Sequence, residues 1–71
     1  MTRREAFAAR VMASCDTLAQ ARETLADARL TLLLSVERHG SDHPATVYLS
    51  QRQDMLVDAL AARVIGGELT A

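Results

Sequence analysis

The chain has 71 residues and one cysteine, and a length of this order makes one domain, residues 1–71. A chain so short buries only about 60% of its unfolded surface, so its core is marginal unless a partner or a second copy completes it. Hydrophobic residues make up 49% and charged residues 24%, which excludes a disordered chain, and only 3% are aromatic, which predicts a core of Leu, Val, Ala and Met in packed helices.

The charge pattern and the apolar runs exclude two classes of partner. The net charge is −1, and the eight basic residues, all arginines, are mixed with nine acidic ones. Nucleic-acid binders show a basic face with stacking aromatics, which this chain lacks, so no nucleic-acid partner is expected. Arg3, Arg4 and Arg10 are interpreted as a solvated helix end. The run of large apolar residues at 32–34 is too short for a bilayer and no signal-peptide pattern occurs, so no membrane partner is expected.

The single cysteine, Cys15, has no partner for an internal disulfide. A reducing, cytoplasmic location is therefore the simple expectation. Because no basic residue is positioned by the sequence to activate its thiol, Cys15 is interpreted as a small core residue.

The first helix is expected to begin at Thr2-x-x-Glu5, which has the form of a capping box. Apolar and small residues then recur in steps of four and three, a heptad pattern: Phe7, Val11, Ser14, Leu18, Ala21, Leu25, Ala28, Leu32 and Ser35. We expect one long helix from about residue 3 to 38. The alternative is two helices divided at residues 14–17, whose side chains are weak helix formers and good caps.

The apolar surface of this helix widens at residues 30–34, beyond what one seam requires. A helix of this kind is covered on more than one side. The widening predicts either a dimerisation or docking surface, or a single partner helix that covers both sides.

A turn and a second helix follow. Gly40 is expected to end the first helix, and Pro44 to open the next, with Asp42 or His43 as its cap. The second helix should run from 44 to 65 and stop at Gly66. The predicted fold is therefore all-α, an antiparallel two-helix hairpin with a long first helix, which a homodimer would extend to a four-helix arrangement.

The second helix carries polar residues within its apolar arc. On a helical wheel Leu49, Leu56 and Leu60 fall together and should pack on the first helix. The apolar arc extends away from these leucines through five further residues: Val47, Val57, Ala61, Val64 and Ile65. Ser50 and Asp54 lie within this extension. Gln53 lies between them and the leucines, and Gln51 lies at the edge of the arc. An unpaired buried carboxylate is strongly unfavourable. Either the arc is open to solvent, or it is a docking face with polar chemistry at its centre.

The stretch "GSDHPATVYLSQRQDMLV" resembles the small regulatory aspartyl-phosphate phosphatases of the stage-zero sporulation protein E type. That family carries a Ser-Gln-Glu-Leu-Asp signature, followed after one residue by an aliphatic pair. Ser50, Gln51 and Asp54 match it, and residues 56–57 supply the pair. Gly40 and Pro44 have the family's spacing before the signature. The resemblance covers about residues 25–65. Three residues depart from it: Arg52 and Gln53, where the family has an acidic residue and a leucine, and His43, where an aspartate or serine is usual before the proline.

The resemblance implies an enzyme that removes phosphate from the phosphoaspartate of a response regulator and so negatively regulates a sporulation-type phosphorelay. No cofactor of its own is implied, since the phosphorylated regulator, its partner, supplies the Mg²⁺. Asp54 would accept a proton from the attacking water or fix that water, Gln51 would position it, and Ser50 would bond the partner or steady Asp54. Gln53 is a second candidate for the water-orienting amide. Docking contacts would come from Val47, Gln53, Val57 and Ala61.

Two other readings remain open from the sequence. The first is a non-enzymatic helical-hairpin interaction protein, a dimeric adaptor, antitoxin or inhibitor, in which Ser50 and Asp54 set the register of a helical bundle. The second is a family member that keeps the docking face and has lost catalysis. His39 and His43 are interpreted as solvated turn residues rather than metal ligands, because Gly40 and Pro44 disfavour an intact helix across them.

Overall fold

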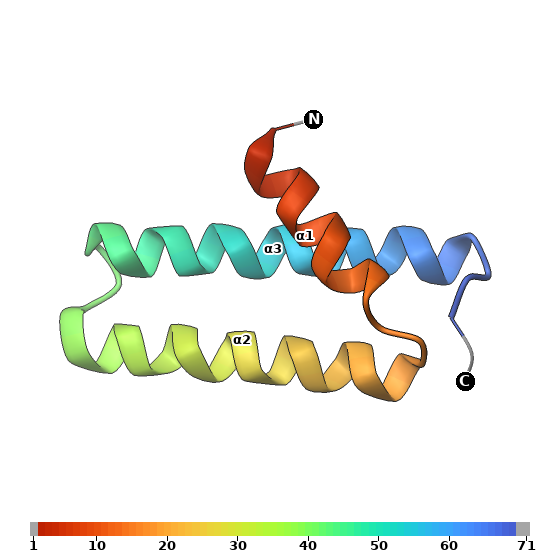
Figure 1. Cartoon of the computed structure of the whole chain (residues 1–71). Coiled ribbons are helices and arrows are strands. Elements are labelled where there is room, and N and C mark those ends of the chain that lie inside the picture. The colour runs from red at the N-terminus through yellow and green to blue at the C-terminus, as the bar shows by residue number, and fades with distance from the viewer. Residues whose placement is uncertain (1, 70–71) are drawn as a thin grey trace.

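The computed structural model describes residues 2–69, which contain three helices and no strand. They are α1 (Arg3–Ala13), α2 (Leu18–His39) and α3 (Pro44–Ile65). The helices α2 and α3 run antiparallel as a hairpin, and α1 crosses α3 obliquely (Figure 1). The predicted all-α hairpin is present, but the first helix is broken and its N-terminal part packs as a separate element.

The helix α1 begins at a capping box, as predicted. The Thr2 hydroxyl accepts a hydrogen bond from the Glu5 amide at 3.1 Å, and the Glu5 carboxylate accepts one from the Thr2 amide at 3.2 Å. The hydrogen bond that the Thr2 backbone amide donates to the Glu5 carboxylate lowers the pKa of this carboxyl, because it stabilises the charged form. The first turn of α1 is therefore fixed by its own sequence.

The prediction of one long first helix is wrong, and the alternative division at residues 14–17 is correct. Ser14 ends α1, where its hydroxyl donates to the Val11 carbonyl. Thr17 starts α2 with a second capping box, in which its side chain accepts from the Gln20 amide and the Gln20 side chain accepts from the Thr17 amide. Two side chains thus satisfy the amides of a helix start here, which favours a break over continuation.

The turn of the hairpin forms as expected. The helix α2 ends at Gly40, which has a positive φ of 87° that glycine adopts without strain. Of the two predicted caps, His43 is the one used: its Nδ1 accepts from the Ala45 amide at 3.1 Å. The helix α3 then runs from Pro44 to Ile65 and ends at Gly66, at the predicted boundaries.

The core lies where α1 meets the hairpin. It agrees with the predicted heptad seam within α2, and within α1 only at Val11, which is half-buried against it. Ala21, Ala28 and Ser35 are buried on α2, with Leu56 opposite them on α3. In α1 the buried residues are instead Ala8 and Met12, while the predicted Phe7 and Ser14 are exposed. The break at residues 14–17 reorients α1, so the seam of the first helix does not continue through it. Cys15 is buried, as expected.

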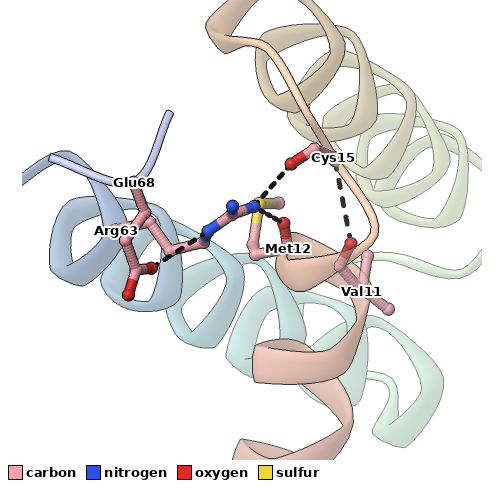
Figure 2. Close-up of polar contacts among 5 residues, drawn as sticks. All are labelled: Val11, Met12, Cys15, Arg63 and Glu68. Atoms are coloured by element: carbon pink, nitrogen blue, oxygen red, sulfur yellow. Dashed lines mark hydrogen bonds and ion pairs between the residues drawn. The ribbon is translucent and has the colours of Figure 1, made fainter. Parts of the chain in front are cut away.

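Arg63 fastens α1 to α3. Its guanidinium donates hydrogen bonds to the carbonyl oxygens of Met12 and Cys15, the latter at 2.6 Å, and forms an ion pair with Glu68 at 3.3 Å (Figure 2). Carbonyls at the end of a helix lack intrahelical partners, so this side chain acts as a C-terminal cap supplied by another helix.

None of the three helices within residues 2–69 has the combination of length and apolar character that a membrane span requires.

Candidate functional site

The predicted docking arc forms an exposed face on α3. We call it the α3 outer face and define it by Val47, Ser50, Asp54, Val57 and Ala61. All five residues are exposed. They recur in steps of three and four along a helix that presents its leucines to α2, so one side of α3 carries them together. Exposure in the single chain is compatible with both alternatives for this arc, a solvent-exposed surface and a docking face, so docking stays a prediction.

Ser50 and Asp54 are available for intermolecular contacts. They lie one helical turn apart on the α3 outer face, and neither side chain has a hydrogen bond or ion pair with the rest of residues 2–69. The Ser50 hydroxyl therefore does not bond to its own helix backbone, as Thr24 and Thr31 do on α2. A hydroxyl and a carboxylate framed by valines can bind a polar partner group and exclude water around it at the same time.

Gln51 lies at the edge of this face and is held by α1. The Arg4 guanidinium donates to its Oε1 at 2.9 Å and lies 4.9 Å above the Tyr48 ring. Arg4 is exposed in the first turn of α1, as expected, and in addition it contacts α3. The residues are 47 positions apart, and no pattern in the sequence indicates that α1 crosses α3 at this point. Oε1 of an amide has two lone pairs and Nε2 has two donors, so Gln51 keeps further hydrogen-bonding capacity.

Gln53 and Arg52, the two departures within the signature itself, are half-buried rather than exposed. Gln53 lies one turn from both Leu49 and Leu56, on the side of α3 that meets α2. Its Oε1 and the Nε of Arg52 are buried without a hydrogen-bond partner among residues 2–69. The structure thus brings Ser50 and Asp54 together, places Gln51 beside them, and puts Gln53 on the neighbouring side of the helix.

The turn end of the hairpin holds two polar contacts. The hydroxyls of Ser35 and Thr46 form a buried hydrogen bond of 2.7 Å between α2 and α3. The His39 and His43 rings stack, with their centroids 4.5 Å apart. Within residues 2–69 no three His, Cys, Asp or Glu side chains are grouped so that they could hold a metal ion. These contacts fix the register of the hairpin near the α3 outer face.

A hollow lies between α1 and α3, and neither Ser50 nor Asp54 lines it. It has a volume of about 410 Å³ and a floor that includes four alanines, Ala9, Ala13, Ala59 and Ala62. Glu5, Asp58 and Glu68 are among its other lining residues. None of the residues predicted for catalysis or docking lines it, so its geometry does not bear on their assignment.

Comparison of the chain with protein-family models, with curated proteins and with solved structures gave no match. The resemblance of residues 25–65 to the aspartyl-phosphate phosphatases therefore stays a prediction from the motif and its spacing. What the structure adds is the arrangement on α3: a serine and a carboxylate exposed together within an apolar face, beside an amide held by α1.

Proposed function

We propose that this chain is a phosphatase that hydrolyses the phosphoaspartate of a response regulator. The observation that carries the proposal is the α3 outer face, where Ser50 and Asp54 are exposed one turn apart without intramolecular polar partners. Val47, Val57 and Ala61 surround them with apolar surface that a docked regulator would cover. The Gly40 and Pro44 spacing in front of this helix supports the same assignment.

Hydrolysis of a phosphoaspartate requires few groups from the protein that docks on the regulator. An acyl phosphate is reactive, and the Mg²⁺ of the regulator neutralises charge on the phosphoryl oxygens. Hydrolysis then depends on a water held in line with the phosphorus–oxygen bond that breaks. The water oxygen bonds to phosphorus, the regulator's aspartate leaves as a carboxylate, and inorganic phosphate is released.

The side chains on α3 divide this work. Asp54 accepts the proton of the attacking water, or fixes the water by a hydrogen bond. Gln51 orients that water through the amide capacity left free by Arg4. Ser50 bonds a backbone group of the docked regulator. The half-buried Gln53 is less accessible for this purpose than the exposed Gln51.

The test is phosphate release from the host's purified, phosphorylated response regulators, with and without this chain. Accelerated release from one regulator is expected, and Asp54→Ala should remove about 100-fold or more of the acceleration, the usual contribution of a general base. Glu23→Ala is the matched control, because Glu23 is an exposed carboxylate on α2, a different helix from the one that carries the α3 outer face. Full activity in both Asp54→Ala and Gln51→Ala would refute the assignment of these residues.

A non-enzymatic interaction protein is the second candidate, and the exposed leucines of α2 favour it. Leu30, Leu33 and Leu34 lie on the surface of the monomer, where they offer contact area but no reactive group. No acceleration on any regulator would support this candidate. Tight binding of a phosphorylated regulator without phosphate release would instead indicate a docking protein that has lost catalysis.

A further inference from the structure

The side of α2 that faces away from α3 is apolar and uncovered. Leu30, Leu33 and Leu34 are 57%, 53% and 56% exposed. Ala26, Leu30, Leu33 and Glu37 follow the four-three-four spacing of a heptad seam, on the side opposite the buried Ala28 and Ser35. We call Ala26, Leu30, Leu33 and Leu34 the α2 outer face. Among the described residues, α3 packs on the opposite side of α2 and α1 packs on α3, so neither covers this face.

The monomer also exposes more surface than a compact chain of its mass. Its accessible area is 5064 Å² at 7.7 kDa, whereas a folded monomer of that mass exposes about 4,300 Å². The excess of roughly 760 Å² is close to the area of about 800 Å² that each partner buries in a standard interface. The radius of gyration, 12.7 Å, likewise exceeds the value of about 11 Å for a compact domain of this length.

An acidic and a basic residue beside the α2 outer face are placed so that each would meet its opposite charge in a second copy related by a two-fold axis. Asp27 and Arg38 lie on the same flank of α2, six residues before and five residues after Leu33. Neither side chain has an ion pair with the described part of the chain. When two copies of α2 lie antiparallel with Leu33 near the axis, Asp27 of each copy faces Arg38 of the other.

The surface around Leu34 is also hollowed to receive side chains. A depression of about 360 Å³ lies beside Leu34 on the flank where α2 meets α3, with Arg38 of α2 and Ala45 and Leu49 of α3 in its lining, and a second of about 390 Å³ is lined by Leu34, Glu37 and Arg38. In the antiparallel register, Leu30 and Thr31 of a second copy lie opposite Leu34 and Ser35. Leu30 of that copy then inserts beside Leu34, as a knob does in the hole of a coiled coil.

We propose that the α2 outer face binds a second copy of this chain, α2 against α2, antiparallel, with Leu33 near the two-fold axis and Asp27–Arg38 ion pairs on one flank. The arrangement is isologous, so the same patch serves both subunits and the association closes at two copies. The interface does not depend on the phosphatase assignment. It uses α2 and leaves the α3 outer face on a different helix.

Sedimentation velocity of the full chain over a range of concentrations tests the proposal. The expected result is a species of twice the 7.7 kDa chain mass. Leu33→Glu should raise the dissociation constant about 100-fold or more, because it buries a carboxylate against its symmetry mate. Val64→Glu, at a valine of α3 that is also 53% exposed, is the matched control and should leave the dimer intact. A chain that stays monomeric at all concentrations, or a dimer broken by the control alone, overturns the proposal.

Two further measurements do not depend on how well Leu33→Glu folds. In a Cys15→Ser background, Leu33→Cys should form a disulfide-linked dimer on mild oxidation and Val57→Cys should not, since a disulfide needs the two Cα atoms within about 7 Å. The direction of the helices is tested by charge. Asp27→Arg should weaken the dimer and the double variant Asp27→Arg, Arg38→Asp should restore it; failure of the restoration would exclude the antiparallel register.

Discussion

Gln53 has a side-chain oxygen that is buried in the hairpin without a hydrogen-bond partner among residues 2–69. This oxygen, Oε1, lies on a side of α3 that otherwise presents Leu49 and Leu56 to α2. An unpaired buried acceptor loses its hydrogen bonds to water and gains nothing in return, a cost of about 1–3 kcal/mol. A polar side chain at this position therefore reduces the stability of the hairpin.

Gln53→Leu is expected to stabilise the chain. The substitution removes the unpaired oxygen and adds an apolar group to the α2–α3 interface, so a gain of about 1–2 kcal/mol is expected. For a domain of this size each kcal/mol corresponds to a rise in melting temperature of about 4–8 °C. Thermal unfolding followed by circular dichroism, at one fixed protein concentration, measures the change.

Gln51→Leu is the matched control for this substitution. Gln51 is also a glutamine on α3, but it is exposed and accepts a hydrogen bond from Arg4. Its replacement should bring no gain in melting temperature. Equal effects of the two substitutions would show that burial of the Gln53 oxygen is not what costs stability.

At the scale of elements, the short segment of residues 14–17 decides the fold. Without the break α1 and α2 would form one rod, and α1 would not reach α3. Thr17 makes the break specific, because its capping box supplies acceptors for two amides at the start of α2. The side-chain oxygen Oε1 of Gln20 also accepts a hydrogen bond from the Asp16 backbone amide at 2.7 Å. This bond connects the segment before Thr17 to the first turn of α2.

Thr17→Ala should destabilise the chain by about 1 kcal/mol, the usual cost of losing an N-cap. Thr31→Ala is the control, since Thr31 lies within α2 and its hydroxyl bonds only to the Asp27 carbonyl of its own helix. Alanine is the better helix former at such a position, so little or no loss is expected. Urea denaturation of both variants measures the difference, and equal losses would show that the cap at Thr17 does not stabilise the break.

The sequence predicts the elements that carry local signals and misses those that depend on distant contacts. Gly40, Pro44 and Gly66 define the ends of their helices, and the observed boundaries of α3 agree with the expectation. The break before Thr17 carries a signal of the same kind, but the continuous heptad pattern outweighed it. The Arg4–Gln51 and Arg63–Met12 contacts follow from the crossing of α1 over α3, which no local pattern encodes.

The same reasoning holds for the candidate site. Ser50, Asp54 and their apolar neighbours were placed on one face by helical spacing, and the structure has them exposed together. The half-buried state of Gln53 could not be read from spacing, because it depends on how closely α2 approaches. The orientation of Gln51 could not be predicted from spacing either, because it is set by Arg4, a residue outside the motif.

For the whole molecule, the arrangement separates two surfaces of different character. The α2 outer face offers leucines and self-complementary charges, whereas the α3 outer face offers a serine and a carboxylate among valines. α1 packs on α3 along yet another side, from Tyr48 to Arg63. A dimer formed through α2 would therefore carry two α3 outer faces, each complete within one chain.

This separation predicts that association and phosphate release are independent. Leu33→Glu should abolish the dimer and leave the rate of phosphate release per chain within about twofold, since substitutions at distant sites without shared partners act additively. Asp54→Ala should do the reverse, with the dimer retained and the release lost. Sedimentation and release assays on the same two preparations measure both quantities. A loss of release in Leu33→Glu that tracks the loss of dimer would show that residues from both chains complete the site, and would place the docked regulator across the two-fold axis.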